Sequence, residues 1–419
     1  YGLNVASGGA ILPDHDVVVF DEAHVLEDIM SDTVGVEIAP GRFTALSGIV
    51  RRILDDPKLV GSIAEIAEGL RDALTPHVGN RLSTPLPDSV QEVLTDARLR
   101  LGRANETLVA IDTKNADAKQ RRLRAQTMTG RAIEQLDIAI EGREGYVAFV
   151  SGSRDAPRLE VAPLDVGPAM TEGVWSQRTA ILTSATIPSS LAARVGIAPD
   201  SVDVADVGSP FDYEHHSMLY CAMHLPNPNS EGFRAAVHDE LEALITAAGG
   251  RTLALFTSWR SMDEAAEALR ERIDLPILTQ RDLPKPALIK AFADSDETCL
   301  VATAGLFPGV DVPGQTLSLV VIDRIPFPRP DDPLLSARRE QLGPTAFSEI
   351  DIPRASMMLA QACGRLIRSA TDKGVVAVMD PRLGTARYRW DIIRALPPMQ
   401  RTKVRADVEN FLRGITSGV

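Results

Sequence analysis

Short apolar runs that end in small polar or acidic residues constrain the fold of this chain more than any other feature. The run at residues 17–20 (VVVF) leads directly into Asp21 and Glu22, and the run at 180–182 (AIL) leads into Thr183. Such β-branched runs are typical of strands that are buried on both faces of a parallel sheet. We therefore expect a parallel sheet whose strands carry polar groups at their carboxyl ends.

The second half of the chain alternates between apolar runs and helical patterns. This alternation is typical of βαβ units, which place parallel strands side by side in one sheet. The sequence therefore predicts an α/β chain with a second parallel-sheet domain after a boundary near residues 209–211. Strands are expected at 252–256, 299–302, 318–322 and 375–379, and helices at 261–272, 353–368 and 405–414.

Residues 41–140 differ from both sheet-forming parts. Leucine, alanine, arginine and glutamate dominate there. Apolar residues recur at helical spacing in two runs, Leu94, Leu99, Leu101 and Leu108, then Leu123, Ile133, Leu136 and Ile140. The segment 85–87 (PLP) is expected to separate two of the helices. We interpret this region as an insertion of several long helices, followed by strands near 146–150 and 158–161.

Composition excludes several classes of protein. Of 419 residues, 44% are hydrophobic and 24% charged, which excludes a collagenous or wholly disordered chain. The net charge of −13 argues against a protein that is basic over its whole surface, although a local basic groove is compatible with it. The chain has no run of about 18 apolar residues, so no membrane span is expected. Cys221, Cys299 and Cys363 form no CxxC pair, and a reducing cytoplasm is the expected location.

Residues 21–24 (DEAH) form the first motif that could carry chemistry. Carboxylates at the carboxyl end of a parallel strand lie in the crevice where such folds bind ligands. One carboxylate there can hold Mg²⁺, and the next can orient and deprotonate an attacking water. The alternative is a solvated loop or a cap for the following helix.

Residues 183–186 (TSAT) also follow an apolar run. Their small hydroxyl groups could hydrogen-bond a neighbouring acidic loop, or they could simply form a turn.

Gln361, Arg365 and Arg368 are spaced to share one face of a helix, with Leu359 on the opposite face. Gly364 beside them would permit the close approach of another backbone. Two arginines on one face can clamp a polyphosphate, although a solvated face of an amphipathic helix is the alternative.

Two basic clusters, at 98–103 and 119–124, fall within the predicted helical insertion. They could track a phosphate backbone, or they could be solvated helix faces. The glycine- and proline-containing segment 309–314 (GVDVPG) is either a functional loop at the edge of a sheet or an ordinary connection.

Taken in order, these segments resemble motifs II to VI of superfamily 2 helicases, and in particular the DinG branch, which is related to the XPD helicase. Residues 21–24 match the DEAH box, 184–186 the SAT motif, 256–258 motif IV, 309–314 with 323–327 motif V and its flank, and 361–368 motif VI. The resemblance implies an α/β fold with two RecA-like motor domains, the first incomplete, and an arch-like helical insertion. We expect residues 1–40 and 146–208 to form the first motor domain, 41–145 the arch and 209–419 the second motor domain.

The resemblance also implies a role for each matched residue, with ATP and Mg²⁺ as cofactors. The hydrolysis and coupling residues would be Asp21 (on Mg²⁺), Glu22 (activating the water), His24, Ser184, Ala185 and Thr186. The residues that reach the nucleotide would be Gly309, Asp311, Gln361, Gly364, Arg365 and Arg368, and those on the DNA backbone would be Ser258 and Thr303. The implied activity is 5′ to 3′ movement of a monomer along single-stranded DNA, with unwinding of forked or duplex DNA and a link to DNA repair.

Three departures qualify this expectation. The sequence contains no GxxxxGK[ST] phosphate loop, which in the family lies upstream of the DEAH box. The cysteines that hold a 4Fe–4S cluster in many relatives would also lie upstream, and they are absent from this sequence. Pro308 stands where relatives often have a polar residue. We therefore expect an N-terminally truncated helicase that binds ATP poorly. The alternatives are a catalytically inactive nucleic-acid-binding protein, and an NTPase that acts on something other than nucleic acid.

Overall fold

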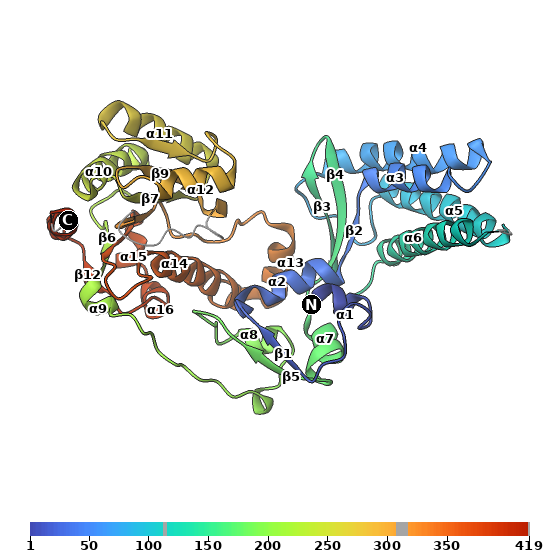
Figure 1. Cartoon of the computed structure of the whole chain (residues 1–419), viewed down its shortest axis with the longest axis horizontal. Coiled ribbons are helices and arrows are strands. Elements are labelled where there is room, and N and C mark those ends of the chain that lie inside the picture. The colour runs from blue at the N-terminus through green and yellow to red at the C-terminus, as the bar shows by residue number, and fades with distance from the viewer. Residues whose placement is uncertain (112–114, 307–316, 418–419) are drawn as a thin grey trace. The chain divides into compact units, whose positions relative to one another are not determined.

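The computed structural model describes residues 1–111, 115–306 and 317–417. The chain divides into two compact units (Figure 1). Unit 1 comprises Tyr1–Asp203 and Arg329–Ala346, and unit 2 comprises Val204–Pro328 and Phe347–Val419. The expected motif V residues Gly309 and Asp311 lie outside the described residues.

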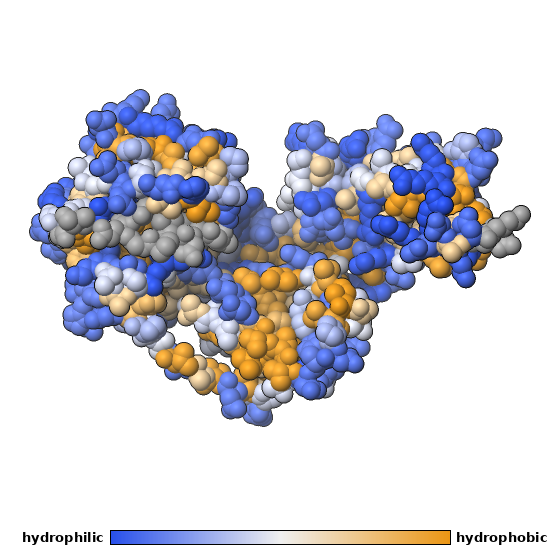
Figure 2. Space-filling view, in the orientation of Figure 1, coloured by the Kyte–Doolittle hydropathy of each residue, from blue (hydrophilic) through white to orange (hydrophobic). Residues whose placement is uncertain are grey.

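The first sheet of unit 1 pairs β1 (Val17–Phe20) in parallel with β5 (Thr179–Leu182). One face packs on a small core around α2 (Leu26–Val34), whereas the other face leaves Val19 60% and Ile181 49% exposed. Figure 2 shows apolar side chains gathered over these two strands. The expectation that both faces are buried is therefore wrong for these strands, because the residues that the structure describes leave the second face largely uncovered.

Helices are present over the part of unit 1 where the sequence predicts them, although Leu99 and Leu123 of the predicted apolar pattern are exposed. Four long helices bury a leucine-rich face against each other, and Leu94, Leu101 and Leu108 are fully buried there. The predicted break at 85–87 lies between α4 and α5. A three-stranded antiparallel sheet in the order β2-β4-β3 adjoins these helices. The helices are α3 (Pro40–Val50), α4 (Pro57–Leu74), α5 (Asp88–Ala110) and α6 (Ala116–Glu141), and the strands are β2 (Val36–Ile38), β3 (Tyr146–Ser153) and β4 (Ala156–Pro163).

Unit 1 also contains short helices around the first sheet and one helix from much later in the chain. The short helices are α1 (Gly2–Ala6), α7 (Gly167–Met170) and α8 (Leu191–Arg194), and the late helix is α13 (Pro333–Leu342).

Unit 2 is built on a seven-stranded parallel sheet in the order β12-β6-β11-β10-β7-β9-β8. Its central strands are apolar throughout and are covered on both faces, as expected for βαβ units. All four predicted strands are present. The strands are β6 (Ser217–Cys221), β7 (Thr252–Phe256), β8 (Ile277–Thr279), β9 (Cys299–Thr303), β10 (Leu319–Ile322), β11 (Gly374–Val378) and β12 (Gln400–Thr402).

The helices of unit 2 include the three that the sequence predicts, although α14 ends at Leu366 rather than at Arg368. Among the described residues, no helix combines the length and apolar character needed to cross a membrane. The helices are α9 (Tyr213–His216), α10 (Phe233–Ala248), α11 (Trp259–Arg272), α12 (Lys285–Ala293), α14 (Ile352–Leu366), α15 (Arg382–Thr385), α16 (Arg389–Arg394) and α17 (Arg405–Thr416).

Candidate nucleotide-hydrolysis site

The chain turns sharply at Glu22, where β1 ends. Glu22 adopts left-handed backbone angles (φ 51°, ψ 44°), which are uncommon for residues other than glycine, and it caps a short 3₁₀ turn from Ala23 to Val25. The Ala23 amide donates to the Thr183 carbonyl at 2.9 Å. This bond ties the turn to the end of β5, so that the two polar segments are side by side as the sequence predicts.

Asp21 presents one engaged and one available carboxylate oxygen. Its Oδ1 accepts hydrogen bonds from the Thr183 hydroxyl at 2.9 Å and from the Glu22 amide at 3.0 Å. Magnesium is commonly held by one or two carboxylates together with waters and substrate phosphates, so an exposed single carboxylate fits it. Within the described ranges, no cluster of three or more His, Cys, Asp or Glu side chains could hold a metal ion. Asp21 would therefore share the ion with solvent and substrate.

Glu22, His24 and Ser184 form a compact triangle. The His24 Nδ1 lies 2.8 Å from the Ser184 Oγ and 3.1 Å from the Glu22 Oε2, and the Ser184 hydroxyl lies 3.4 Å from the same carboxylate oxygen. The Glu22 side chain is 58% exposed, whereas His24 is buried. The arrangement leaves the carboxylate open to a reactant while its inner side contacts the SAT segment.

Burial lowers the pKa of His24, and the nearby carboxylates of Glu22 and Asp28 partly oppose that effect. The imidazole therefore favours its neutral form near pH 7. Both neighbours contact the same nitrogen, Nδ1, so the hydrogen bond that this nitrogen makes links Ser184 to Glu22.

The other SAT residues contribute less to these contacts. Ala185 is exposed, and the Thr186 amide donates weakly to the Ser184 hydroxyl at 3.4 Å. Thr183, by contrast, contacts Asp21 directly but is absent from the site residues that the resemblance names. Its position directly after an apolar strand was the available signal.

In unit 2, a buried carboxylate joins the segments that follow β7 and β10. Asp323 accepts from the Thr257 amide at 2.9 Å and from the Thr257 hydroxyl at 3.1 Å. Burial raises the pKa of Asp323 to about 7, although these hydrogen bonds and Arg324 act in the opposite direction. Asp323 thus fixes the start of the expected motif IV, a role that sequence reasoning did not assign.

The two expected DNA-contacting residues of unit 2 already have intramolecular partners. The Ser258 hydroxyl caps α11 by accepting from the Ser261 amide at 3.1 Å. The Thr303 amide and hydroxyl both donate to the Gln280 side chain, at 2.7 and 2.8 Å. Both residues lie at carboxyl ends of parallel strands, where the expectation places them, and their DNA contacts stay a prediction.

The expected motif VI residues lie at the end of α14. Gln361 and Arg365 are half-buried on the helix, while Arg368 follows its last residue and is also half-buried. The prediction that all three share one helix face is therefore wrong for Arg368. No described atom lies within 4 Å of a Cβ placed on Gly364, so the expected close backbone approach is not observed among the described residues.

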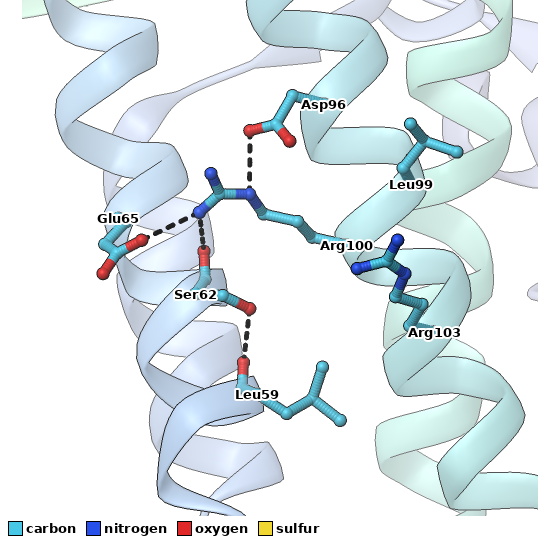
Figure 3. Close-up of a pocket in the computed structure, with 7 residues that line it drawn as sticks. All are labelled: Leu59, Ser62, Glu65, Asp96, Leu99, Arg100 and Arg103. Carbon is cyan, nitrogen blue, oxygen red and sulfur yellow. Dashed lines mark hydrogen bonds and ion pairs between the residues drawn. The ribbon is translucent and has the colours of Figure 1, made fainter.

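A basic cluster of the insertion lines a pocket of about 320 Å³ between α4 and α5. Figure 3 shows Arg100 reaching from α5 to Glu65 on α4, with Asp96 on its own helix bonded to the same guanidinium. Arg98 pairs with Asp137 at 2.8 Å. Because acidic partners match the charges of Arg98 and Arg100, the geometry favours a structural role for these two arginines over phosphate binding.

The three cysteines do not fit an iron–sulfur cluster. Burial raises the pKa of Cys221, Cys299 and Cys363, each to about 12. Cluster ligation requires thiolates that converge on one point, and the described residues contain no such group.

Comparisons with known proteins agree with this geometry. Residues 241–399 match the family described as the helicase C-terminal domain. A solved XPD helicase aligns with 93% of this chain and 68% of its own chain, with a TM-score of 0.59 at 18% identity, which supports a shared motor fold. The likeness to the solved structure shows the α/β fold, and the family match places a helicase C-terminal domain at residues 241–399.

The relatives by sequence are more specific. The chain is 35% identical over 427 residues to the ATP-dependent helicase DinG of Mycobacterium tuberculosis and 32% identical over 439 residues to the ATP-dependent DNA helicase YoaA of Escherichia coli, covering 98% and 96% of this chain. The chain is therefore a homologue of the DinG and YoaA helicases. The chain spans 64% of the length of the first relative and 66% of the second.

Proposed function

We propose that this chain forms the motor part of an ATP-dependent DNA helicase that moves 5′ to 3′ along single-stranded DNA and unwinds duplex DNA. The contact of Glu22 and His24 with Ser184 carries the proposal, because it joins a candidate base to the segment that would sense hydrolysis. The family relationship and the parallel-sheet fold support it.

Each residue of the unit 1 site has a task in this proposal. Mg²⁺ would supply neutralisation of phosphate charge, and the free oxygen of Asp21 would hold it. The exposed Glu22 carboxylate would orient the attacking water and accept its proton, since it can reach solvent from a fixed turn. His24 and Ser184 would transmit the resulting change at Glu22 to β5, with Ala185 and Thr186 continuing that segment.

The residues of unit 2 would complete the nucleotide and DNA contacts. Arg365 and Arg368 would neutralise charge on the transferring phosphate, and Gln361 would contact the nucleotide beside them. Gly309, Asp311 and Gly364 are proposed nucleotide contacts, and Ser258 and Thr303 proposed DNA contacts. The proposed partners are single-stranded and forked DNA, bound by a monomer that works in the cytoplasm.

We also propose that the phosphate loop is supplied by a segment outside the printed residues. The printed sequence contains no GxxxxGK[ST], and the curated relatives named above are longer than this chain. The apolar side chains exposed on β1 and β5 support the same idea, because a parallel sheet is normally covered on both faces. Any 4Fe–4S cluster would also depend on such a segment.

The proposal is tested by measuring ATP hydrolysis with and without single-stranded DNA, using the longest reading frame that contains this chain and a phosphate loop. DNA should increase turnover, and forks with a free 5′ tail should be unwound. Hydrolysis that ignores DNA would contradict the helicase assignment and favour another NTPase.

A second candidate is a catalytically inactive nucleic-acid-binding protein, which the absence of a phosphate loop from the printed sequence favours. An authentic start codon near Tyr1, together with DNA binding but no hydrolysis, would support this alternative.

A further inference from the structure

The segment Arg329–Ala346 belongs to unit 1, although the chain on both sides of it belongs to unit 2. Its helix α13 begins after Asp332, whose side chain caps it by accepting from the Leu335 amide at 2.8 Å. Ala337 and Leu334 pack against Val147 and Phe149 of β3. We call this segment the tether, because both of its ends continue into unit 2.

Arg338 is the most deeply engaged polar residue of the tether. It is only 5% exposed, which is rare for an arginine unless its charge is matched. Its Nη2 donates to the Ser31 hydroxyl at 2.6 Å, its Nε donates to the Leu164 carbonyl at 3.0 Å, and its Nη1 lies 3.2 Å from the Glu27 carboxylate. Asp28 adds a more distant carboxylate at 3.8 Å.

These contacts converge on the helix that continues the DEAH segment. Glu27 and Ser31 lie on α2, which starts at Leu26, directly after the turn that contains His24. Glu27 is itself 5% exposed and also pairs with Arg194 at 3.2 Å, so its charge is buried between two guanidinium groups. The Ser31 hydroxyl donates to the Glu27 carbonyl at 2.8 Å, which closes a network within one turn of α2.

A buried ion pair fixes geometry more than it adds stability, because desolvation offsets much of its attraction. The fork of the guanidinium contacts Glu27 and Ser31, one turn apart on the same face of α2, through separate nitrogens, which a lysine could not do in the same geometry. The network is therefore suited to holding the orientation of α2, and with it the turn at residues 21–25, relative to the tether.

We propose that Arg338 is a positioning residue for the hydrolysis site. This proposal rests on the function proposed above. In it, Arg338 holds α2 so that Glu22 and His24 keep their contacts with Ser184. Because the tether continues into unit 2 at both ends, a displacement of unit 2 would pull on Arg338 and so reach the DEAH turn without passing through the nucleotide.

The first test needs no catalysis and uses this chain as it stands. Amide hydrogen exchange is compared for the wild type, Arg338→Met, Arg338→Lys and the control Glu340→Gln. Glu340 lies on the same helix as Arg338, and the control removes its exposed ion pair with Arg81. Arg338→Met should accelerate exchange at residues 21–31 at least tenfold while the helices α4 and α5 stay protected, and Arg338→Lys should give a partial effect. Unchanged exchange at residues 21–31, or an equal effect of Glu340→Gln, overturns the proposal.

The second test uses the form with a phosphate loop and distinguishes a positioning role of Arg338 from a role in fold stability alone. Turnover per nucleotide-binding site is measured well below the melting temperature of each variant. Arg338→Met should lower kcat about tenfold with the KM for ATP changed less than about twofold, and Arg338→Lys should restore part of kcat. A lower melting temperature with wild-type kcat means that Arg338 only stabilises the fold, which overturns the proposal. A wild type without hydrolysis instead rejects the proposed function and leaves the exchange result standing.

Discussion

His24 and Ser184 are separated by 160 positions in the sequence, and the His24 Nδ1 lies 2.8 Å from the Ser184 Oγ. The contact connects the turn after β1 to the segment after β5, and both strands belong to one parallel sheet. The contact therefore joins the DEAH and SAT segments, and Glu22 contacts both of its residues.

Ser184→Ala should weaken the response of the SAT segment to hydrolysis. The substitution removes a hydroxyl that contacts both His24 and Glu22, and a hydrogen bond of this kind contributes about 1 kcal/mol. We expect a two- to tenfold loss of DNA-stimulated turnover, with basal nucleotide binding retained, in the form with a phosphate loop. Ser201→Ala, at an exposed serine of the same unit, is the matched control. Equal stimulation of turnover by DNA in Ser184→Ala and Ser201→Ala would contradict the coupling role of Ser184.

Asp323→Asn should flatten the pH dependence of unit 2 stability. Burial raises the pKa of Asp323 from 3.8 to about 7, so the folded state binds an extra proton between those values. Stability from this group is therefore fully present below about pH 4 and is lost as the pH rises through about 7. The free energy of unfolding should fall by roughly 1 kcal/mol between pH 6 and pH 8 in the wild type because of this group.

An asparagine at 323 can still accept from the Thr257 amide and donate to its hydroxyl, so the local geometry should survive. Urea titrations at the two pH values check the difference, with the exposed Asp274→Asn as the control that should keep the wild-type slope. A slope that persists in Asp323→Asn would place the titrating group elsewhere.

Leu101→Ala should destabilise the helical insertion by about 2–5 kcal/mol, because it opens a cavity in a fully buried position. Leu99→Ala lies two positions earlier on the same helix, where the side chain is 53% exposed, and should change stability by less than about 0.5 kcal/mol. Denaturant unfolding followed by circular dichroism measures both. Similar losses in the two variants would show that α5 is packed differently from this description.

The three thiols should react slowly with a thiol reagent in the native chain. Their pKa values are raised to about 12 by burial, and the thiolate is the reactive form. Fewer than about one equivalent should react in minutes at pH 8, and all three after denaturation. Rapid native labelling of Cys299 or Cys363 would contradict their burial.

The sequence predicts β7, β9, β10 and β11 of unit 2, because short apolar runs buried on both faces leave a strong local signal, whereas β6, β8 and β12 were not predicted. For residues 183–186 the sequence left open a hydrogen bond to an acidic loop or a simple turn, and the structure shows the Thr183 hydroxyl donating to Asp21. The predicted burial of both faces of β1 and β5 was wrong for one face, because the covering of a face depends on which other segments pack on it and not on the pattern of one strand.

The contacts of the tether could not be predicted, whereas the buried Asp323 was overlooked. Arg338 pairs with Glu27 across a sequence separation of hundreds of residues, and neither residue has a local pattern that distinguishes it from a solvated charge. Asp323 follows an apolar strand just as Asp21 does, so the same rule could have found it. The basic cluster at 98–103 shows the opposite case, where a visible charge pattern is neutralised by acidic partners.

The most direct test of the central claim is ATP turnover by Glu22→Gln in the form with a phosphate loop, measured with single-stranded DNA and alongside nucleotide binding. Glutamine preserves the shape and the left-handed turn but removes the charge that would accept a proton from water. We predict that turnover falls at least a hundredfold while nucleotide binding changes less than about threefold. Turnover at the wild-type rate would show that Glu22 is not the catalytic base and that the hydrolysis site lies elsewhere.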